Sequence, residues 1–103
     1  MIVNLRIVKR LADKTGESAN GKWRMACYVG EFTEDTPNGP SVHAVLLELS
    51  DKRWNIKNVD QLVINKTETP ANIHLDVHEY EGRYFPDVSV YLRDPDLLVP
   101  REY

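Results

Sequence analysis

The sequence predicts a small, mainly β domain in which five strands form a closed barrel, with one short helix between the third and fourth strands. Several short runs alternate apolar and polar residues, as half-buried strands do. Polar turns that contain glycine separate these runs and lead into aromatic residues. The 103 residues match the size of one domain. We therefore predict a single domain over 1–103, with a tail from about residue 94.

The first strand is predicted over residues 2–11, because apolar side chains occupy every second position from residue 3 to residue 7. Arg6 and Arg10 fall on its opposite, open face. Residues 12–21 lack apolar periodicity and are rich in glycine, serine and asparagine. This composition predicts a long, mobile hairpin loop.

The second and third strands are predicted over residues 22–32 and 41–49, joined by a turn region at 33–40. Both faces of these two strands are largely apolar. A strand of a small barrel needs only one apolar face, so the second face should be covered. The cover can be a partner, a ligand or another part of the same protein.

Ser50 is placed to cap a short helix. Apolar residues then recur at helical spacing at positions 56, 59, 62 and 63, although residues 62–65 fit a short strand equally well. Residues 66–72 predict a loop, since they contain two threonines and a proline.

The fourth and fifth strands are predicted over 73–80 and 84–92 around a turn at 81–83. Clean alternation directs the odd-numbered residues of the fourth strand and the even-numbered residues of the fifth toward the core. Pro95 ends the last strand, because proline cannot continue the interior of a sheet ladder. Residues 97–99 are expected to pack back onto the body.

The composition predicts a cytoplasmic protein. A single cysteine, Cys27, excludes an intramolecular disulfide framework. Charges interrupt the apolar N-terminal run, unlike a signal peptide, and no apolar stretch approaches the roughly 20 residues of a membrane helix. The net charge is −3, yet residues 1–24 hold six basic and two acidic side chains, a balance of +4. This asymmetry predicts either a local anion-binding patch or ordinary solubilising charge.

Five strands with a helix between the third and fourth is the element order of an oligonucleotide/oligosaccharide-binding (OB) barrel. The motif Thr15-Gly-Glu-Ser-Ala-Asn-Gly-Lys-Trp23, followed by an aromatic at Tyr28, resembles bacterial single-stranded DNA-binding proteins. It is most similar to a small uncharacterised family of OB-fold proteins related to them. The closing Glu81-Gly-Arg-Tyr-Phe85 is similar to the last hairpin of that family.

The resemblance implies a non-catalytic module that binds single-stranded DNA or RNA on stacking aromatics beside a basic groove. It points to Trp23, Arg24, Trp54 and Tyr84. The open strand faces and the charge pattern add four further candidates, namely Arg6, Arg10, Lys22 and Tyr91. For each tryptophan the alternative is packing in the core or at a dimer interface.

A homodimer is expected, since a second copy would cover the additional apolar faces. The alternative function is a protein-interaction or structural OB domain that forms a homo-oligomer and binds no nucleic acid.

No enzyme, metal or cofactor is predicted. His74-x-Asp76-x-His78 places three potential ligands on one strand face, but its two histidines would lie roughly 13 Å apart on a regular strand. One metal ion cannot bridge that distance, so a solvated outer face is the preferred interpretation. Neither a nucleophile-elbow motif nor a glycine-rich phosphate loop is present in the sequence.

Overall fold

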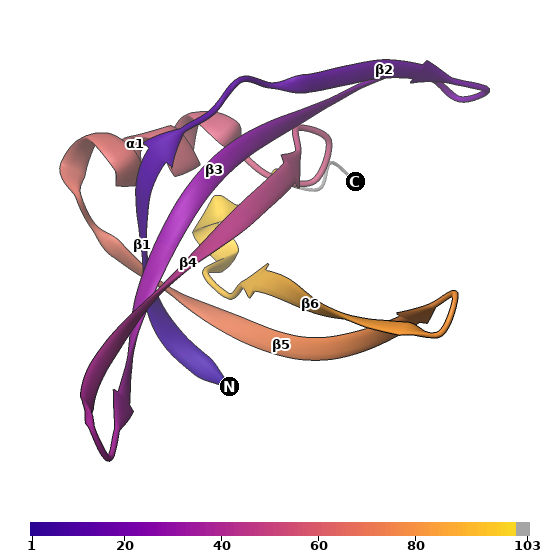
Figure 1. The fold of residues 1–103 in the computed structure, drawn as a ribbon. Helices are drawn as coiled ribbons and strands as arrows, with labels where there is room; N and C mark the ends of the chain where they lie inside the picture. The colour runs from indigo at the N-terminus through magenta and orange to yellow at the C-terminus, as the bar shows by residue number, and fades with distance from the viewer. Residues whose placement is uncertain (101–103) are drawn as a thin grey trace.

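The protein folds as a mainly β structure in a computed structural model that describes residues 1–100 (Figure 1). Within these residues, six antiparallel strands form one sheet, and one α-helix and a short 3₁₀ helix pack against it. In chain order the elements are β1 (Ile2–Arg10), β2 (Lys14–Ser18), β3 (Gly21–Thr36), β4 (Gly39–Ser50), α1 (Ile56–Asn65), β5 (Glu68–Tyr80), β6 (Arg83–Leu92) and η1 (Pro95–Leu97).

The sheet is curled around β1. Its strand order is β2-β3-β1-β5-β6, with β4 on the free side of β3. β1 pairs with β5 through its first half and with β3 through its second half, and a bulge between Ile7 and Lys9 interrupts the pairing with β3. Across residues 1–100 no ladder joins β4 to β6, so the sheet stays open between these two strands. The predicted closure of the barrel is therefore not seen.

The predicted count of five strands is wrong, because the expected mobile loop at 12–21 contains β2. Its residues pair with the start of β3 from Lys14 opposite Met25 to Ser18 opposite Gly21. β2 shows no apolar alternation. Its central residue, Gly16, packs directly against the ring of Trp23. Backbone pairing, not burial of its own side chains, forms this strand.

The expected loop at 66–72 is also wrong, because β5 begins at Glu68. Thr69 and Ala71 are fully buried and pair with β1. Pro70 is tolerated here because its nitrogen, which has no hydrogen to donate, faces the side where the β6 ladder has just ended; on that same side its carbonyl accepts a hydrogen bond from Arg93 N at 3.0 Å. The turn expected at 33–40 likewise shrinks to two residues between Thr36 and Gly39.

The core lies inside the curl of the sheet, beneath α1. Its residues come from every long strand, from the helix and from the C-terminal segment. Asn55 caps α1 by accepting from Asn58 N, and the helix runs through residues 62–65, so these residues do not form a strand. The buried side chains include Leu5, Ile7, Tyr28, Leu47, Val59, Ile73, Leu92 and Leu97.

The C-terminal segment packs back onto the body, as its apolar residues predicted. Asn55 N donates to Leu97 O at 2.8 Å, and Val99 N donates to Arg53 O at 2.9 Å. These bonds fix η1 beside the chain that leaves β4. The last part of the predicted tail, residues 101–103, lies outside the described residues. Within residues 1–100, no helix is both long enough and apolar enough to cross a membrane.

The β5–β6 hairpin projects from the rest of the fold, as Figure 1 shows. Only the base of its predicted inward face is buried, where Ile73 is 3% exposed. Further out, Leu75 and Val77 are 69% and 64% exposed. The prediction that both point into the core is wrong, because alternation identifies an apolar face but not how far the body reaches along it.

The second apolar face of β3 is covered in part by the protein itself. Cys27 is buried, and Met25 and Val29 are half-buried. On β4, in contrast, Val42 and Leu46 remain exposed.

Candidate nucleic-acid interface

Trp23 is held flat near the end of the β2–β3 hairpin. Gly16 lies directly opposite it on β2, and a Cβ atom at residue 16 would come within 2.4 Å of the Trp23 ring. Only glycine leaves room for this packing. Trp23 is nevertheless 39% exposed, so the side of the ring that does not cover Gly16 is available to a ligand. A supported ring with open surface is the arrangement on which nucleobases stack.

Charged residues of both signs line the surface that contains this ring. A shallow concave surface of about 810 Å³ is lined by β2, the start of β3 and the turn after β4. Asp51 N donates to Arg24 O at 3.4 Å, and this contact places the turn beside β3. The lining side chains carry three positive and two negative charges, from Lys22, Arg24, Lys52, Glu17 and Asp51.

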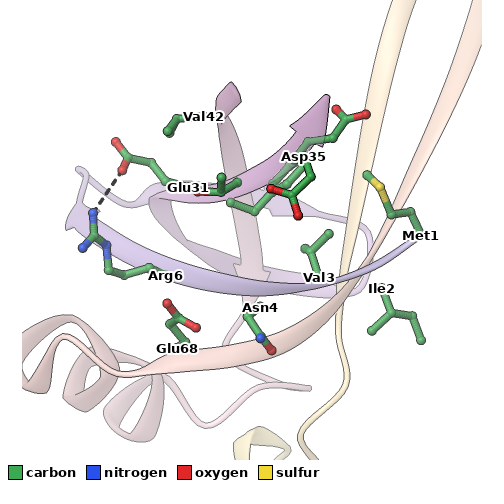
Figure 2. Close-up of a pocket in the computed structure, with 12 residues that line it drawn as sticks. Met1, Ile2, Val3, Asn4, Arg6, Glu31, Asp35, Val42 and Glu68 are labelled. Carbon is green, nitrogen blue, oxygen red and sulfur yellow. Dashed lines mark hydrogen bonds and ion pairs between the residues drawn. The ribbon is translucent and has the colours of Figure 1, made fainter. Parts of the chain in front are cut away.

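Arg6 lies in a different hollow, shown in Figure 2. Its guanidinium is 3.4 Å from the Glu31 carboxylate, and Asp35 and Glu68 also line the hollow. This surface of about 600 Å³ lies where β1 and β3 separate. Its acidic lining disfavours a phosphate backbone, and the structure does not bring Arg6 to Trp23.

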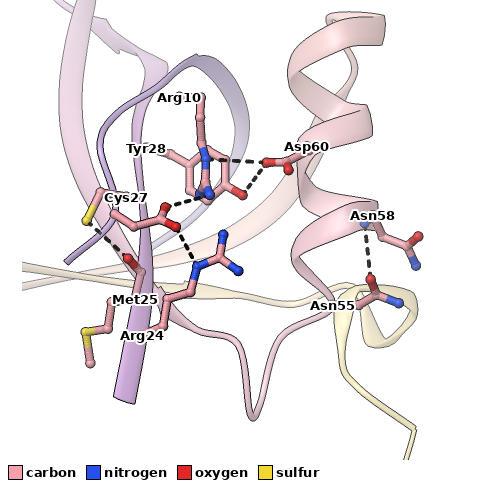
Figure 3. Close-up of polar contacts among 9 residues, drawn as sticks. Arg10, Arg24, Met25, Cys27, Tyr28, Asn55, Asn58 and Asp60 are labelled. Carbon is pink, nitrogen blue, oxygen red and sulfur yellow. Dashed lines mark hydrogen bonds and ion pairs between the residues drawn. The ribbon is translucent and has the colours of Figure 1, made fainter. Parts of the chain in front are cut away.

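Arg10 and Arg24 are both held by Asp13. Arg10 Nη2 lies 2.6 Å from Asp13 Oδ1, and its guanidinium carbon lies 4.8 Å from the centre of the Tyr28 ring. Tyr28 is buried and donates to Asp60 at 2.6 Å, contacts that Figure 3 shows. Arg10 is therefore part of the packing between the sheet and α1.

The contacts of Tyr28 and Arg24 raise the pKa of each side chain. Burial, followed by the hydrogen bond to Asp60, raises the pKa of Tyr28 well above its ordinary value. The hydrogen bond to Asp13 and the charge of that carboxylate raise the pKa of Arg24. Arg24 stays about half exposed in spite of this bond, so its charge still reaches the surface near Trp23.

The remaining candidates lie elsewhere. Trp54 is only 9% exposed and belongs to the core, so it offers no stacking surface. Tyr84 and Tyr91 are exposed on β6, in the other projecting hairpin. The structure thus brings together Lys22, Trp23 and Arg24 of the predicted set.

Two residues that line this concave surface, Lys52 and Gly16, were not predicted from the sequence. The antiparallel register of β3 and β4 could have indicated Lys52, since it places residue 51 beside residue 24. Gly16 could be found only by recognising β2 as a strand.

The histidines pair with three different carboxylates. His43 lies 2.9 Å from Glu34, His78 lies 3.0 Å from Asp87, and His74 lies 3.8 Å from Asp76. Among residues 1–100, no three histidine, cysteine, aspartate or glutamate side chains gather in a geometry that could hold a metal ion.

Replacing Gly16 with alanine is expected to displace the Trp23 ring, because the new methyl group would lie within 2.4 Å of it. The displaced ring should shift its fluorescence emission to longer wavelength as water reaches it. Glu17→Gln is the matched control on the same strand, and it should leave the emission unchanged. An unshifted spectrum for Gly16→Ala would show that the ring does not rest on this glycine.

A scan against protein-family models, a search of curated proteins and a search of solved structures each found no match to this chain.

Proposed function

We propose that the protein is a non-catalytic OB-type module that binds single-stranded DNA or RNA in the cytoplasm. The observation that carries this proposal is the ring of Trp23, which is supported by Gly16, partly exposed and bordered by Lys22, Arg24 and Lys52. The resemblance of the residues around Trp23 to single-stranded DNA-binding proteins adds support.

Stacking and charge contribute separately to the affinity for a single strand. A base stacks on Trp23 with a contribution of roughly 1–3 kcal/mol, and the nearby cations bind the adjoining phosphates. The β2–β3 and β5–β6 hairpins project to the same side of the molecule in Figure 1. A strand that leaves Trp23 toward the β5–β6 hairpin would meet Tyr84 and Tyr91 as further stacking surfaces.

Asp13 restrains this binding, since it neutralises Arg24 next to Trp23. We expect Asp13→Asn to raise the affinity for oligo-dT a few-fold and to steepen its salt dependence, because a freed arginine adds a phosphate contact. Asp35→Asn removes an equal charge in the hollow around Arg6 and is the control. Equal affinities for wild type and both variants would show that Asp13 does not restrain binding.

Fluorescence anisotropy of labelled oligo-dT and oligo-rU at low and moderate salt tests the function. We expect saturable binding to one or both strands that weakens as salt rises, and weaker binding to a duplex of equal length. The salt dependence reports released counterions, with a slope of about 0.7 per phosphate contacted on a single strand. Flat curves for both single strands at low salt would contradict the proposal.

The alternative is a protein-interaction or structural OB domain, and two observations favour it. Arg6, Arg10 and Arg24 each contact a carboxylate, which lowers the positive potential available to phosphates. Large apolar side chains are exposed on the β5–β6 hairpin. Flat titrations together with a stable oligomer would select this alternative.

A further inference from the structure

One carboxylate is shared by two arginines beside the proposed nucleic-acid surface. Asp13 lies in the short connection between β1 and β2. Its Oδ1 atom is 2.6 Å from Arg10 Nη2, and its Oδ2 atom accepts a hydrogen bond from Arg24 Nε at 2.5 Å. Figure 3 shows these contacts of Arg10 and Arg24. A single negative charge thus serves two positive charges.

Arg10 is held in place by contacts other than the one to Asp13. Its guanidinium lies over the ring of Tyr28, and its Nε atom is 3.8 Å from Asp60 Oδ1 on α1. The Tyr28 hydroxyl donates to the same oxygen at 2.6 Å. Arg24, in contrast, lies on β3 with its side chain about half exposed. Asp13 can therefore part from Arg24 while Arg10 stays where it is.

Arg10 also has a donor that the fold does not use. Its Nη1 atom is buried, and within residues 1–100 it has no hydrogen-bond acceptor. A buried N–H group without an acceptor is unfavourable. A guanidinium and a carboxylate pair best through two parallel hydrogen bonds, from two nitrogens to two oxygens. Asp13 gives Arg10 only one of its oxygens, because Arg24 occupies the other.

A phosphate bound to Arg24 competes with Asp13. Arg24 lines the concave surface around Trp23, where the proposed strand binds. Its single positive charge cannot neutralise a phosphate and a carboxylate together, and the two anions repel each other. The terminal torsion of an aspartate side chain is soft, so the Asp13 carboxylate can turn at low cost. Turning away from Arg24 leaves Oδ2 free for the unused donor of Arg10.

We propose that Asp13 is a positioning residue that moves from Arg24 onto Arg10 when a phosphate of the bound strand contacts Arg24. In the complex both oxygens of Asp13 accept from Arg10, through Nη1 and Nη2, and Arg24 is free for the phosphate. This inference rests on the proposed function, since it concerns the same surface. The second bond to Arg10 offsets part of the cost of breaking the contact with Arg24. Arg10 therefore contributes to the affinity without touching the strand.

The first test removes the second nitrogen of Arg10. Arg10→Lys keeps the positive charge but cannot form the two parallel bonds. We expect it to lower the affinity for oligo-dT by about two- to tenfold, the net contribution of one hydrogen bond. Arg6→Lys makes the same change on β1 in the hollow away from Trp23, and it should leave the affinity unchanged.

The same substitution in an Arg24→Met background separates positioning from a structural role. Without Arg24, Asp13 pairs with Arg10 both before and after binding, so Arg10→Lys should no longer affect the affinity. Anisotropy with labelled oligo-dT gives the four affinities, and urea unfolding reports the stability of each variant. An equal loss in both backgrounds would overturn the inference, because a structural effect of Arg10 does not depend on Arg24.

Nuclear magnetic resonance of the arginine side chains tests the movement in the absence of nucleic acid. In Arg24→Met the Arg10 Nη–H signals, identified by their proximity to the Tyr28 ring, should shift as Nη1 gains an acceptor. Oligo-dT added to the wild type should shift them in the same direction. Unshifted Arg10 signals in Arg24→Met would overturn the inference whatever the titration gives, and they decide even where Arg10→Lys does not fold. Shifted signals with flat binding curves would contradict the proposed function and leave the exchange between the two arginines supported.

Discussion

The Trp54→Ala variant is expected to lose about 3–5 kcal/mol of its free energy of unfolding, the usual cost of removing a large aromatic from a core. Trp54 is 9% exposed, packs in the main core and pairs with Leu98 of the returning C-terminal segment. Its removal leaves a cavity and loosens the attachment of that segment. Urea unfolding followed by circular dichroism measures the change through the transition midpoint.

Trp54→Phe is the matched control, because it keeps an aromatic ring and should cost clearly less. A loss below about 1 kcal/mol for Trp54→Ala would show that this side chain is not a core residue, and would return it to the set of candidate stacking surfaces.

The Trp23→Ala variant is expected to bind oligo-dT more weakly by roughly 5- to 150-fold, which corresponds to about 1–3 kcal/mol for the loss of one base stack. Trp23 packs on Gly16 at the surface, so the unfolding midpoint should change far less than it does in Trp54→Ala. Anisotropy with labelled oligo-dT gives the affinity, and urea unfolding of the same sample gives the stability.

Trp23→Phe should retain part of the affinity, because a smaller ring still stacks. Tyr80→Ala removes another exposed aromatic from outside the concave surface, and it should leave binding unchanged. Equal affinity for wild type and Trp23→Ala would remove Trp23 from the interface.

Strand alternation predicted a mainly β chain because it follows directly from burial of one strand face. It located the strands whose side chains fill the core. It failed at residues 14–18, where Gly16 and its polar neighbours pair through backbone bonds alone. It failed again at 68–72, where Pro70 suggested a loop although the adjoining Thr69 and Ala71 are buried.

The candidate site was predictable where it depended on neighbours in sequence. Lys22, Trp23 and Arg24 are consecutive on β3, and all three line one concave surface although successive side chains of a strand alternate between its faces. The arginines of β1 could not be placed from sequence, because their carboxylate partners come from distant segments. Glu31 lies on β3 for Arg6, and Asp60 lies on α1 near Arg10. Trp54 shows the same limit, since it lies in a core built from distant segments and its backbone bridges to Leu98 near the end of the chain.

The most direct test of the central claim is the fluorescence of Trp23 alone during a titration with oligo-dT. Trp54→Phe leaves Trp23 as the single tryptophan, so the signal comes only from the proposed stacking surface. We expect saturable quenching at low salt that weakens as salt is added, because a stacked base quenches the ring and phosphate contacts contribute to the affinity. A constant emission through saturating oligo-dT, from a variant that circular dichroism shows to be folded, would contradict stacking on Trp23.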